Sequence, residues 1–180
     1  YTAHHSDRVA AMAVVLARVL HLSEDDTTTV QVAAFAHDIG KISMSDAVLR
    51  KAGPLTDAEW EEMRRCPVTG YDILRKVPQF QQVALIVRHH HERWDGRGYP
   101  DQLAGTAIPL GARIIAVADS IDAMMSNRSY RPAMTATVCH HEIEKNSGVM
   151  YDPQVVAAAM NCWDELVSRY TEVETPPTPY

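Results

Sequence analysis

Apolar residues recur at helical spacing along most of this chain. One face of a helix is outlined in each of these segments: 5–22, 30–40, 54–63, 71–77, 81–91, 109–126, 135–145 and 153–170. No stretch shows the strict apolar and polar alternation of a half-buried strand. The pattern therefore predicts an all-α protein, built as a helical bundle.

Capping residues place several of the predicted helix ends. Ser23 is a candidate N-cap, and Thr56 followed by Glu59 has the spacing of a capping box. Gly40 follows His37 and Asp38 at the position where glycine commonly ends a helix. We therefore expect the side chains of His37 and Asp38 to converge at a helix end.

Other residues predict where helices stop. Pro67 and Gly70 are expected to interrupt the segment that begins at residue 54, and residues 93–109 are rich in turn formers. The last ten residues, 171–180, contain three prolines and little that can be buried. We expect a single domain over residues 1–170 and a disordered tail over 171–180.

Charge and composition exclude several classes of protein. A formal net charge of −6 argues against a binder of nucleic-acid polymers, which needs a basic face. No apolar run is long enough for a membrane helix. The three cysteines, Cys66, Cys139 and Cys162, have no disulfide spacing, so we expect a cytoplasmic location. A start without methionine suggests a domain excised from a longer multidomain protein.

Histidines and aspartates lie where they could converge on a metal. The stretch HHHERWDGRGYP at 89–100 gathers imidazoles before a tight turn, and Asp119 lies in an apolar helix where a lone carboxylate is costly. Nitrogen and oxygen ligands of this kind suit two divalent first-row metals. The candidate ligands are His5, His37, Asp38, His90, His91 and Asp119.

Two motifs carry a family resemblance. HDIGK at 37–41 and HHERWDGRGYP at 90–100 resemble the HD-GYP domains, a branch of the HD-superfamily metal-dependent phosphohydrolases. The stretches YTAHHSDRVA, GPLTDAEWEEMRR, IPLGARIIAVADSIDAM and NRSYR extend the resemblance from residue 1 to roughly 165. It implies a helical domain that hydrolyses the bacterial second messenger cyclic di-GMP to linear pGpG, and in some members to GMP.

The resemblance assigns the candidate ligands to two metals. His5, His37, Asp38 and Asp119 would surround one ion, and Asp38 would bridge to a second ion held by His90 and His91. The ligand types favour Fe or Mn, with Zn, Ni and Co also compatible. His89 is interpreted as an ordinary helix residue.

Further residues are implied to act on the substrate. Asp38 and Lys41 are the expected catalytic residues, and Lys41, Tyr99, Arg128 and Arg131 the expected substrate contacts. The alternative for each arginine is a solvated surface cation. Glu92 and Asp95 are predicted to orient neighbouring imidazoles, and Asp122, one turn beyond Asp119, to face the same site.

One ligand position departs from the family. Cys66, in MRRCPVTG, stands where members usually carry a histidine that binds the second metal. A thiolate could replace it, although it is softer and oxidisable. The preferred interpretation is a small buried thiol, which leaves the second metal one ligand short.

The leading function is thus a cyclic di-GMP phosphodiesterase with two metals. The alternative is a catalytically weak module that senses cyclic di-GMP or docks a protein such as a diguanylate cyclase (GGDEF), and Cys66 favours it. A general mononucleotide phosphohydrolase is disfavoured because the GYP loop is complete. An upstream receiver or sensor domain is expected in the full chain.

Overall fold

The computed structural model describes residues 4–51, 53–127 and 132–174. Over these residues the structure is helical, without a strand; a single bridge pairs Ser147 with Tyr151. In chain order the elements are α1 His5–Val19, α2 Glu24–Ala36, η1 Ile39–Ser43, α3 Asp46–Leu49, α4 Asp57–Leu74, η2 Pro78–Phe80, α5 Gln81–His89, η3 Gly105–Ala107, α6 Leu110–Met125, α7 Ala136–Lys145, α8 Pro153–Asn161 and α9 Trp163–Glu174. The predicted all-α class is confirmed.

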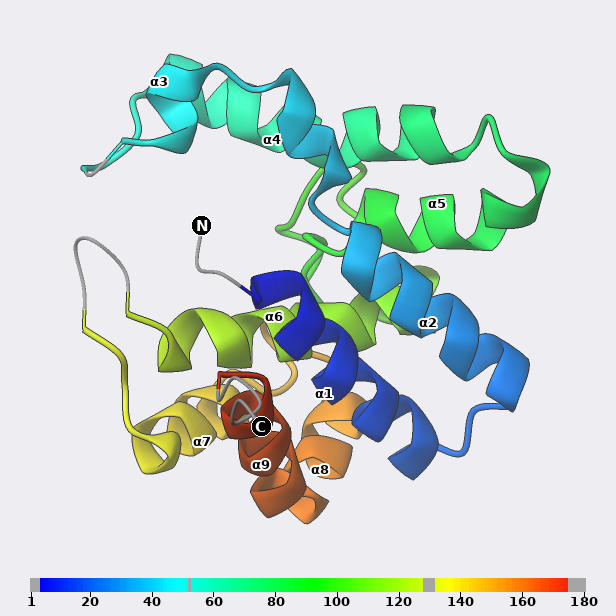
Figure 1. The fold of residues 1–180 in the computed structure, drawn as a ribbon, viewed down its shortest axis with the longest axis vertical. Coiled ribbons are helices and arrows are strands. Elements are labelled where there is room, and N and C mark those ends of the chain that lie inside the picture. The colour runs from blue at the N-terminus through cyan, green and yellow to red at the C-terminus, as the bar shows by residue number, and fades with distance from the viewer. Residues whose placement is uncertain (1–3, 52, 128–131, 175–180) are drawn as a thin grey trace, which may run out of the picture.

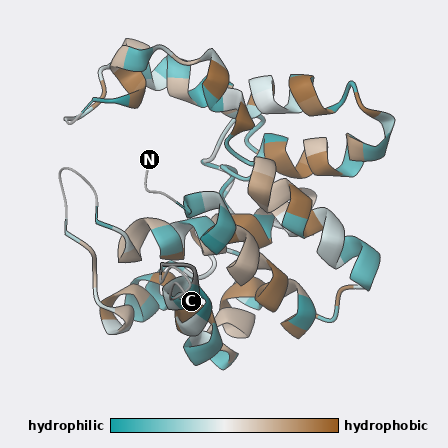
Figure 2. Ribbon diagram, viewed as in Figure 1, coloured by the Kyte–Doolittle hydropathy of each residue, from teal (hydrophilic) through white to brown (hydrophobic). Residues whose placement is uncertain are grey.

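The hydrophobic core lies around α1, the central helix of the bundle. Helix α1 packs against α2, α6 and α9, as Figure 1 shows. Its residues Val9, Met12 and Leu16 are fully buried, as are Ile114 and Ile115 of α6. Figure 2 shows brown, hydrophobic stretches along these helices. The first turn of α1 and the middle of α6 are therefore held firmly, which matters for the site between them.

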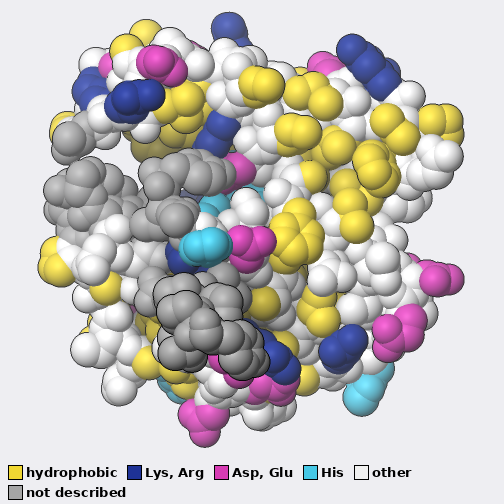
Figure 3. All heavy atoms as spheres, in the orientation of Figure 1, with side chains coloured by type: hydrophobic (Ala, Val, Ile, Leu, Met, Phe, Trp, Pro, Cys, Tyr) yellow, Lys and Arg dark blue, Asp and Glu magenta, His cyan; other side chains and the backbone are white. Residues whose placement is uncertain are grey.

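Helices α4 and α5 form a second, less buried layer at the top of Figure 1. Helix α4 buries only Cys66, Pro67, Gly70 and Leu74 among its residues. Figure 3 shows hydrophobic side chains gathered on the surface over α2, α4 and α5, and Phe35, Ile39, Val77, Phe80 and Leu85 are among the exposed ones. Helix α4 is anchored through the face that contacts η1 and α5, and α5 in turn packs on α2 and α6.

The predicted N-terminal caps are confirmed. The Ser23 hydroxyl accepts a hydrogen bond from the Asp26 backbone N–H at 3.1 Å. Thr56 and Glu59 form a complete capping box, in which the Glu59 carboxylate accepts from the Thr56 N–H at 2.6 Å. These bonds satisfy donors that the first turn leaves without intrahelical partners.

The predicted interruption at Pro67 and Gly70 is wrong, because α4 continues through both residues. Proline inside a helix loses one backbone hydrogen bond. Both residues are buried, however, and a Cβ on Gly70 would lie 2.9 Å from Cγ1 of Val87 in α5. Close packing of α4 on η1 and α5 thus outweighs the local preference to break.

Gly40 does not act as a helix cap. It lies inside η1, and its role is close approach: a Cβ there would overlap the carbonyl oxygen of Cys66 in α4. The glycine lets the segment that carries His37 and Asp38 pack directly on α4.

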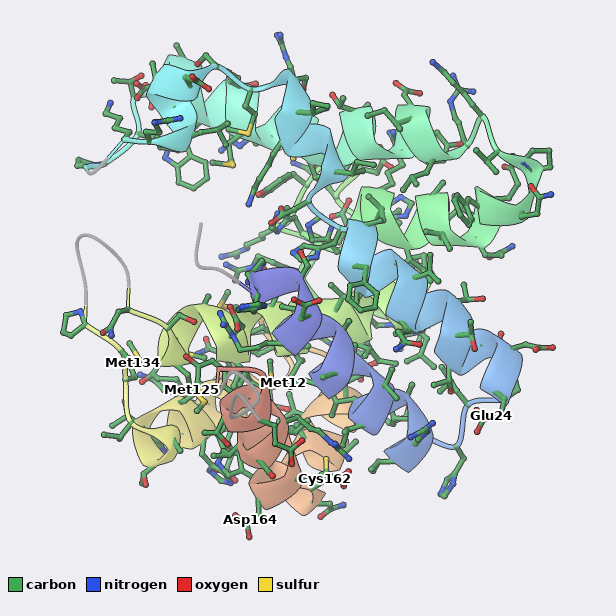
Figure 4. The ribbon with its side chains drawn as sticks, in the orientation of Figure 1. Met12, Glu24, Met125, Met134, Cys162 and Asp164 are labelled. Carbon is green, nitrogen blue, oxygen red and sulfur yellow. The ribbon has the colours of Figure 1, made fainter. Side chains whose placement is uncertain are left out.

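The C-terminal prediction also needs correction. The segment 153–170 is two helices, because Cys162 leaves the helical conformation at φ −121 and ψ 26, at the junction labelled in Figure 4. Helix α9 then continues to Glu174, so residues 171–174 are helical rather than disordered. Residues 175–180 lie outside the described residues.

Candidate metal centre

Four candidate ligands from three parts of the chain meet at one point. His5 begins α1, His37 and Asp38 follow α2, and Asp119 lies in α6. The His5 Nε2 atom is 3.2 Å from Nε2 of His37, 3.6 Å from Oδ2 of Asp38 and 3.5 Å from Oδ1 of Asp119. Ligand atoms of His5, His37 and Asp119 all lie within 4.8 Å of one another, so the group could hold a metal ion.

Hydrogen bonds to one ring nitrogen fix the imidazoles of His37 and His90. The Nδ1 of His37 donates to the Ala34 carbonyl at 2.6 Å, and the Nδ1 of His90 to the Val87 carbonyl at 2.7 Å. A metal-binding histidine is commonly fixed in this way. The Nε2 of His90 is buried and has no hydrogen-bond partner within the described structure. Buried polar atoms are normally paired, so this nitrogen is suited to bind a metal ion.

A row of aromatic rings continues from this group to the GYP loop. The ring centroids of His37 and His90 are 5.3 Å apart, those of His90 and His91 4.0 Å, and those of His91 and Tyr99 5.0 Å. Burial lowers the pKa of His90 well below its usual value, and it lowers the pKa of His91 to about 4. Both imidazoles are therefore neutral near pH 7, the form in which histidine binds metals.

The carboxylates and the nearby cations of the group shift each other's pKa values. Burial acts to lower the pKa of His5, but the hydrogen bond to Asp122 and two further carboxylates outweigh it and raise the pKa to about 9. Burial acts to raise the pKa of Asp38, but His5 and Lys41 hold it well below its usual range. The Nζ of Lys41 donates to Oδ2 of Asp38 at 2.8 Å. Asp38 is thus an ionised carboxylate at the centre of the group.

Asp122 of α6 contacts His5 directly, and its role as a supporting residue stays a prediction. Its Oδ2 accepts from Nδ1 of His5 at 2.6 Å, and its Oδ1 accepts from Nε of Arg8 at 2.5 Å. The Arg8 guanidinium also donates to Ser126 at 3.2 Å and lies over the Tyr170 ring, 5.1 Å from its centroid. Sequence reasoning missed Arg8, although a charged residue three positions after His5 in an apolar helix was the available signal.

Glu92 and Asp95 do not orient the imidazoles as predicted. Oε1 of Glu92 accepts from the Asp101 backbone N–H at 2.7 Å, and Asp95 accepts from the Arg93 guanidinium at 2.7 Å. Both carboxylates therefore brace the loop after α5. The backbone carbonyls of α2 and α5 perform the orienting role instead, and a sequence gives no signal of them.

His89 points away from the metal group. Its Nδ1 donates to the Leu85 carbonyl at 2.8 Å, and its Nε2 lies 2.9 Å from Oδ2 of Asp101. The interpretation of His89 as a structural helix residue agrees with these contacts.

Tyr99 stands next to His91 in a tightly folded loop. The Tyr99 backbone N–H donates to the His91 carbonyl at 3.3 Å. A Cβ at Gly98 would overlap backbone atoms of Arg93 and Glu92, so only glycine permits this approach. Burial raises the pKa of the Tyr99 hydroxyl, so that hydroxyl stays protonated near neutral pH.

Cys66 lies in a small apolar cluster with Met44 and Val48. Burial and the nearby charge of Asp38 raise the pKa of the thiol to about 11, against an opposing effect of Lys41. Because these surroundings are apolar and keep the thiol protonated, they support the interpretation of Cys66 as a buried thiol. Its role as a metal ligand stays a prediction. Arg128 and Arg131, the other expected substrate contacts, lie outside the described residues.

Comparison with known proteins places this arrangement in a family. The sequence profile of the HD domain family matches residues 2–155. The chain belongs to the HD domain family. The HD phosphohydrolases are metal-dependent, and the resemblance expected from the HDIGK and HHERWDGRGYP motifs is confirmed.

Curated relatives of the HD chain carry phosphodiesterase names. The cyclic di-GMP phosphodiesterase response regulator RpfG of Xanthomonas campestris pv. campestris is 44% identical over 156 residues, which are 86% of this chain and 41% of that protein. A cyclic di-GMP phosphodiesterase of Thermotoga maritima is 41% identical over 171 residues, or 94% of this chain and 46% of that protein. The chain thus spans less than half the length of these relatives.

A solved structure supports the fold. The structure of a cyclic GMP-AMP specific phosphodiesterase of Vibrio cholerae superposes with a TM-score of 0.72 at 21% identity, covering 97% of this chain and 49% of that one. Within the described residues, no helix has both the length and the apolar character needed to cross a membrane.

Proposed function

We propose that this HD domain hydrolyses cyclic di-GMP to the linear dinucleotide at a centre of two divalent metals. The observation that carries the proposal is the convergence of His5, His37 and Asp119 within 4.8 Å, next to the partnerless Nε2 of the buried His90. The names of the relatives that share its sequence support the substrate.

The donor set supports the number and kind of metals. His5, His37 and Asp119 would hold one ion, His90 and His91 would hold a second, and Asp38 would contribute its carboxylate to both. Its Oδ2 is 3.4 Å from Nε2 of His37 and 3.6 Å from Nε2 of His5. Imidazole and carboxylate ligands favour Fe or Mn over metals that prefer thiolate. When bound, two such cations lower the pKa of water and neutralise charge on phosphate oxygens.

The residues around the metals have separate tasks in this proposal. Asp122 and the carbonyls of Ala34 and Val87 hold the imidazoles in their ligand tautomers. The ammonium of Lys41, whose side chain is 26% exposed, is anchored by Asp38 and can donate to a phosphate oxygen. The ring of Tyr99 borders His91 on the substrate side.

The experiment is turnover of cyclic di-GMP by protein loaded with Fe(II) or Mn(II) without oxygen. Wild type is expected to form the linear dinucleotide. In His91→Ala the turnover of cyclic di-GMP should fall roughly a hundredfold or more, because losing a metal ligand costs more than losing a residue that only hydrogen-bonds to a ligand. The control is His89→Gln, which removes the neighbouring imidazole that faces Asp101. This variant should retain turnover. Equal losses in the two variants would contradict the assignment of His91.

A second candidate is a weakly catalytic module that binds cyclic di-GMP, favoured by the buried, protonated thiol of Cys66 at a ligand position. Metal-loaded wild type that binds the dinucleotide without turnover would support it. Three further predictions from the sequence stay predictions: a cytoplasmic location, an upstream receiver or sensor domain, and a diguanylate cyclase partner.

A further inference from the structure

Two adjoining clefts open beside the GYP loop. Each has a volume of about 550 Å³, which lies within the roughly 300–1,000 Å³ range of small-molecule sites. Both are lined by Glu61, Arg64, Arg97, Gly98 and Tyr99. The second also reaches Asp57 and His91, a candidate ligand of the second metal. Together the two clefts form a groove, here called the arginine groove, that continues from the metal centre between α4 and the loop after α5.

Cations outnumber carboxylates in the arginine groove, where four arginines line the clefts beside Glu61 and Asp57. Arg64 and Arg97 line both clefts, and Arg65 and Arg93 line one each. Of the residues that the structure describes, none forms a salt bridge with the guanidinium of Arg65 or Arg97. Arg64 pairs with Glu61 at 2.7 Å, but both side chains are more than half exposed and such pairs contribute little.

An exposed aromatic ring completes the groove. Trp60 is 43% exposed and lines the second cleft together with His91 and Tyr99. A nucleobase stacks well on an indole face. Guanidinium groups beside a stacking surface match the two chemical parts of a nucleotide, its phosphate and its base.

A cyclic dinucleotide needs such a second site. It contains two phosphodiester groups on opposite sides of one ring, so while one is at the metals the other remains charged some distance away. On a chain with a net charge of −6, local cations must meet that second charge. Guanidinium groups suit this because they donate two parallel hydrogen bonds to one phosphate.

We propose that the arginine groove binds the half of the cyclic dinucleotide that is not being hydrolysed. Arg64 and Arg97 bind the second phosphate, and Trp60 stacks on the base attached to that half. This inference rests on the proposed function, since it assigns the far half of the same substrate. Tyr99 then lies at the boundary between the groove and the metal centre, because it lines both clefts and contacts His91.

The test compares metal-loaded wild type with Arg64→Ala, Arg97→Ala and the double variant. The matched control is Arg75→Ala, which removes one equally exposed arginine at the end of α4, paired with Asp72 and outside the groove. The KM for cyclic di-GMP should rise roughly ten- to hundredfold in the double variant, the loss expected for charge-assisted hydrogen bonds. The control should change KM less than twofold.

A second substrate separates the groove from the metal centre. Hydrolysis of bis(p-nitrophenyl) phosphate, which has one phosphate and no second half, should stay within twofold of wild type in every arginine variant. Trp60→Ala should raise the KM for cyclic di-GMP, and Trp60→Phe, which keeps a stacking ring, should restore most of it. An unchanged KM in the double variant would overturn the proposal, as would equal losses on both substrates.

The groove and the proposed function can fail separately. If metal-loaded wild type leaves cyclic di-GMP intact, the proposed hydrolysis is wrong, and the dissociation constant is then measured on that same protein. Binding that weakens at least tenfold in the double arginine variant would still support the groove. Binding that is absent from wild type, or equal in the two proteins, would overturn it.

Discussion

Replacing Asp122 by asparagine should damage the metal centre without touching a ligand. Asp122 is 1% exposed, and its two oxygens accept from different donors, Nδ1 of His5 and Nε of Arg8. An asparagine amide keeps the size of the side chain but offers one oxygen and one NH₂ group. One of the two donors must therefore face another donor.

The magnitude follows from these two contacts. Leaving the buried Arg8 guanidinium without its carboxylate should lower the free energy of unfolding by about 3–5 kcal/mol. Loss of the bond that orients His5 should weaken metal binding roughly 10- to 100-fold, the usual cost of removing a partner of a metal-bound imidazole. Metal affinity and stability should thus fall together.

A buried pair elsewhere in the molecule separates these two effects. Asp152 accepts from Arg113 at 2.5 Å and is 3% exposed. It caps the start of α8, and its hydrogen-bond donors, Arg113 and the Gln154 N–H, are not candidate ligands. Asp152→Asn should lose comparable stability and keep metal affinity. The assays are urea unfolding and Mn(II) titration of folded protein. Equal metal affinity in Asp122→Asn and Asp152→Asn would refute the reasoning.

Two further predictions concern the packing of η1 and α4. Gly40→Ala should lower the free energy of unfolding, measured in urea, by about 1–3 kcal/mol, because the added Cβ would overlap the Cys66 carbonyl. Gly53→Ala should change stability little, because open space surrounds Gly53. Equal stabilities of the two variants would contradict this prediction. Cys66→His should raise metal occupancy and cyclic di-GMP turnover, and Cys66→Ser should change neither. A sharp loss of both in Cys66→Ser would instead make the thiolate a working ligand.

The sequence predicted the helices well where periodicity and caps agree. Ser23 and Thr56 start helices as expected, since capping bonds involve residues three apart in the chain. Breaks were less predictable: Pro67 is carried inside α4 by packing on other helices, and the break at Cys162 has no glycine or proline to mark it. Both outcomes depend on tertiary contacts that local patterns do not contain.

The candidate site shows the same division. Side chains at element ends, such as His5, His37 and His90, could be named from the motifs, and the structure aims them at one another. Contacts made through the backbone could not be named, so an orienting role was assigned wrongly to Glu92 and Asp95. The arginine groove also escaped prediction, because Arg64 and Arg97 belong to segments that meet only in the fold.

Metal content tests the central claim most directly. Protein loaded anaerobically with Fe(II) or Mn(II), freed of excess metal and analysed by mass spectrometry should contain about two ions per chain. Asp38→Ala should contain fewer, because in the proposed centre its carboxylate would serve both ions. Folded wild-type protein that retains no metal, or an Asp38→Ala protein that retains as much as wild type, would contradict the account.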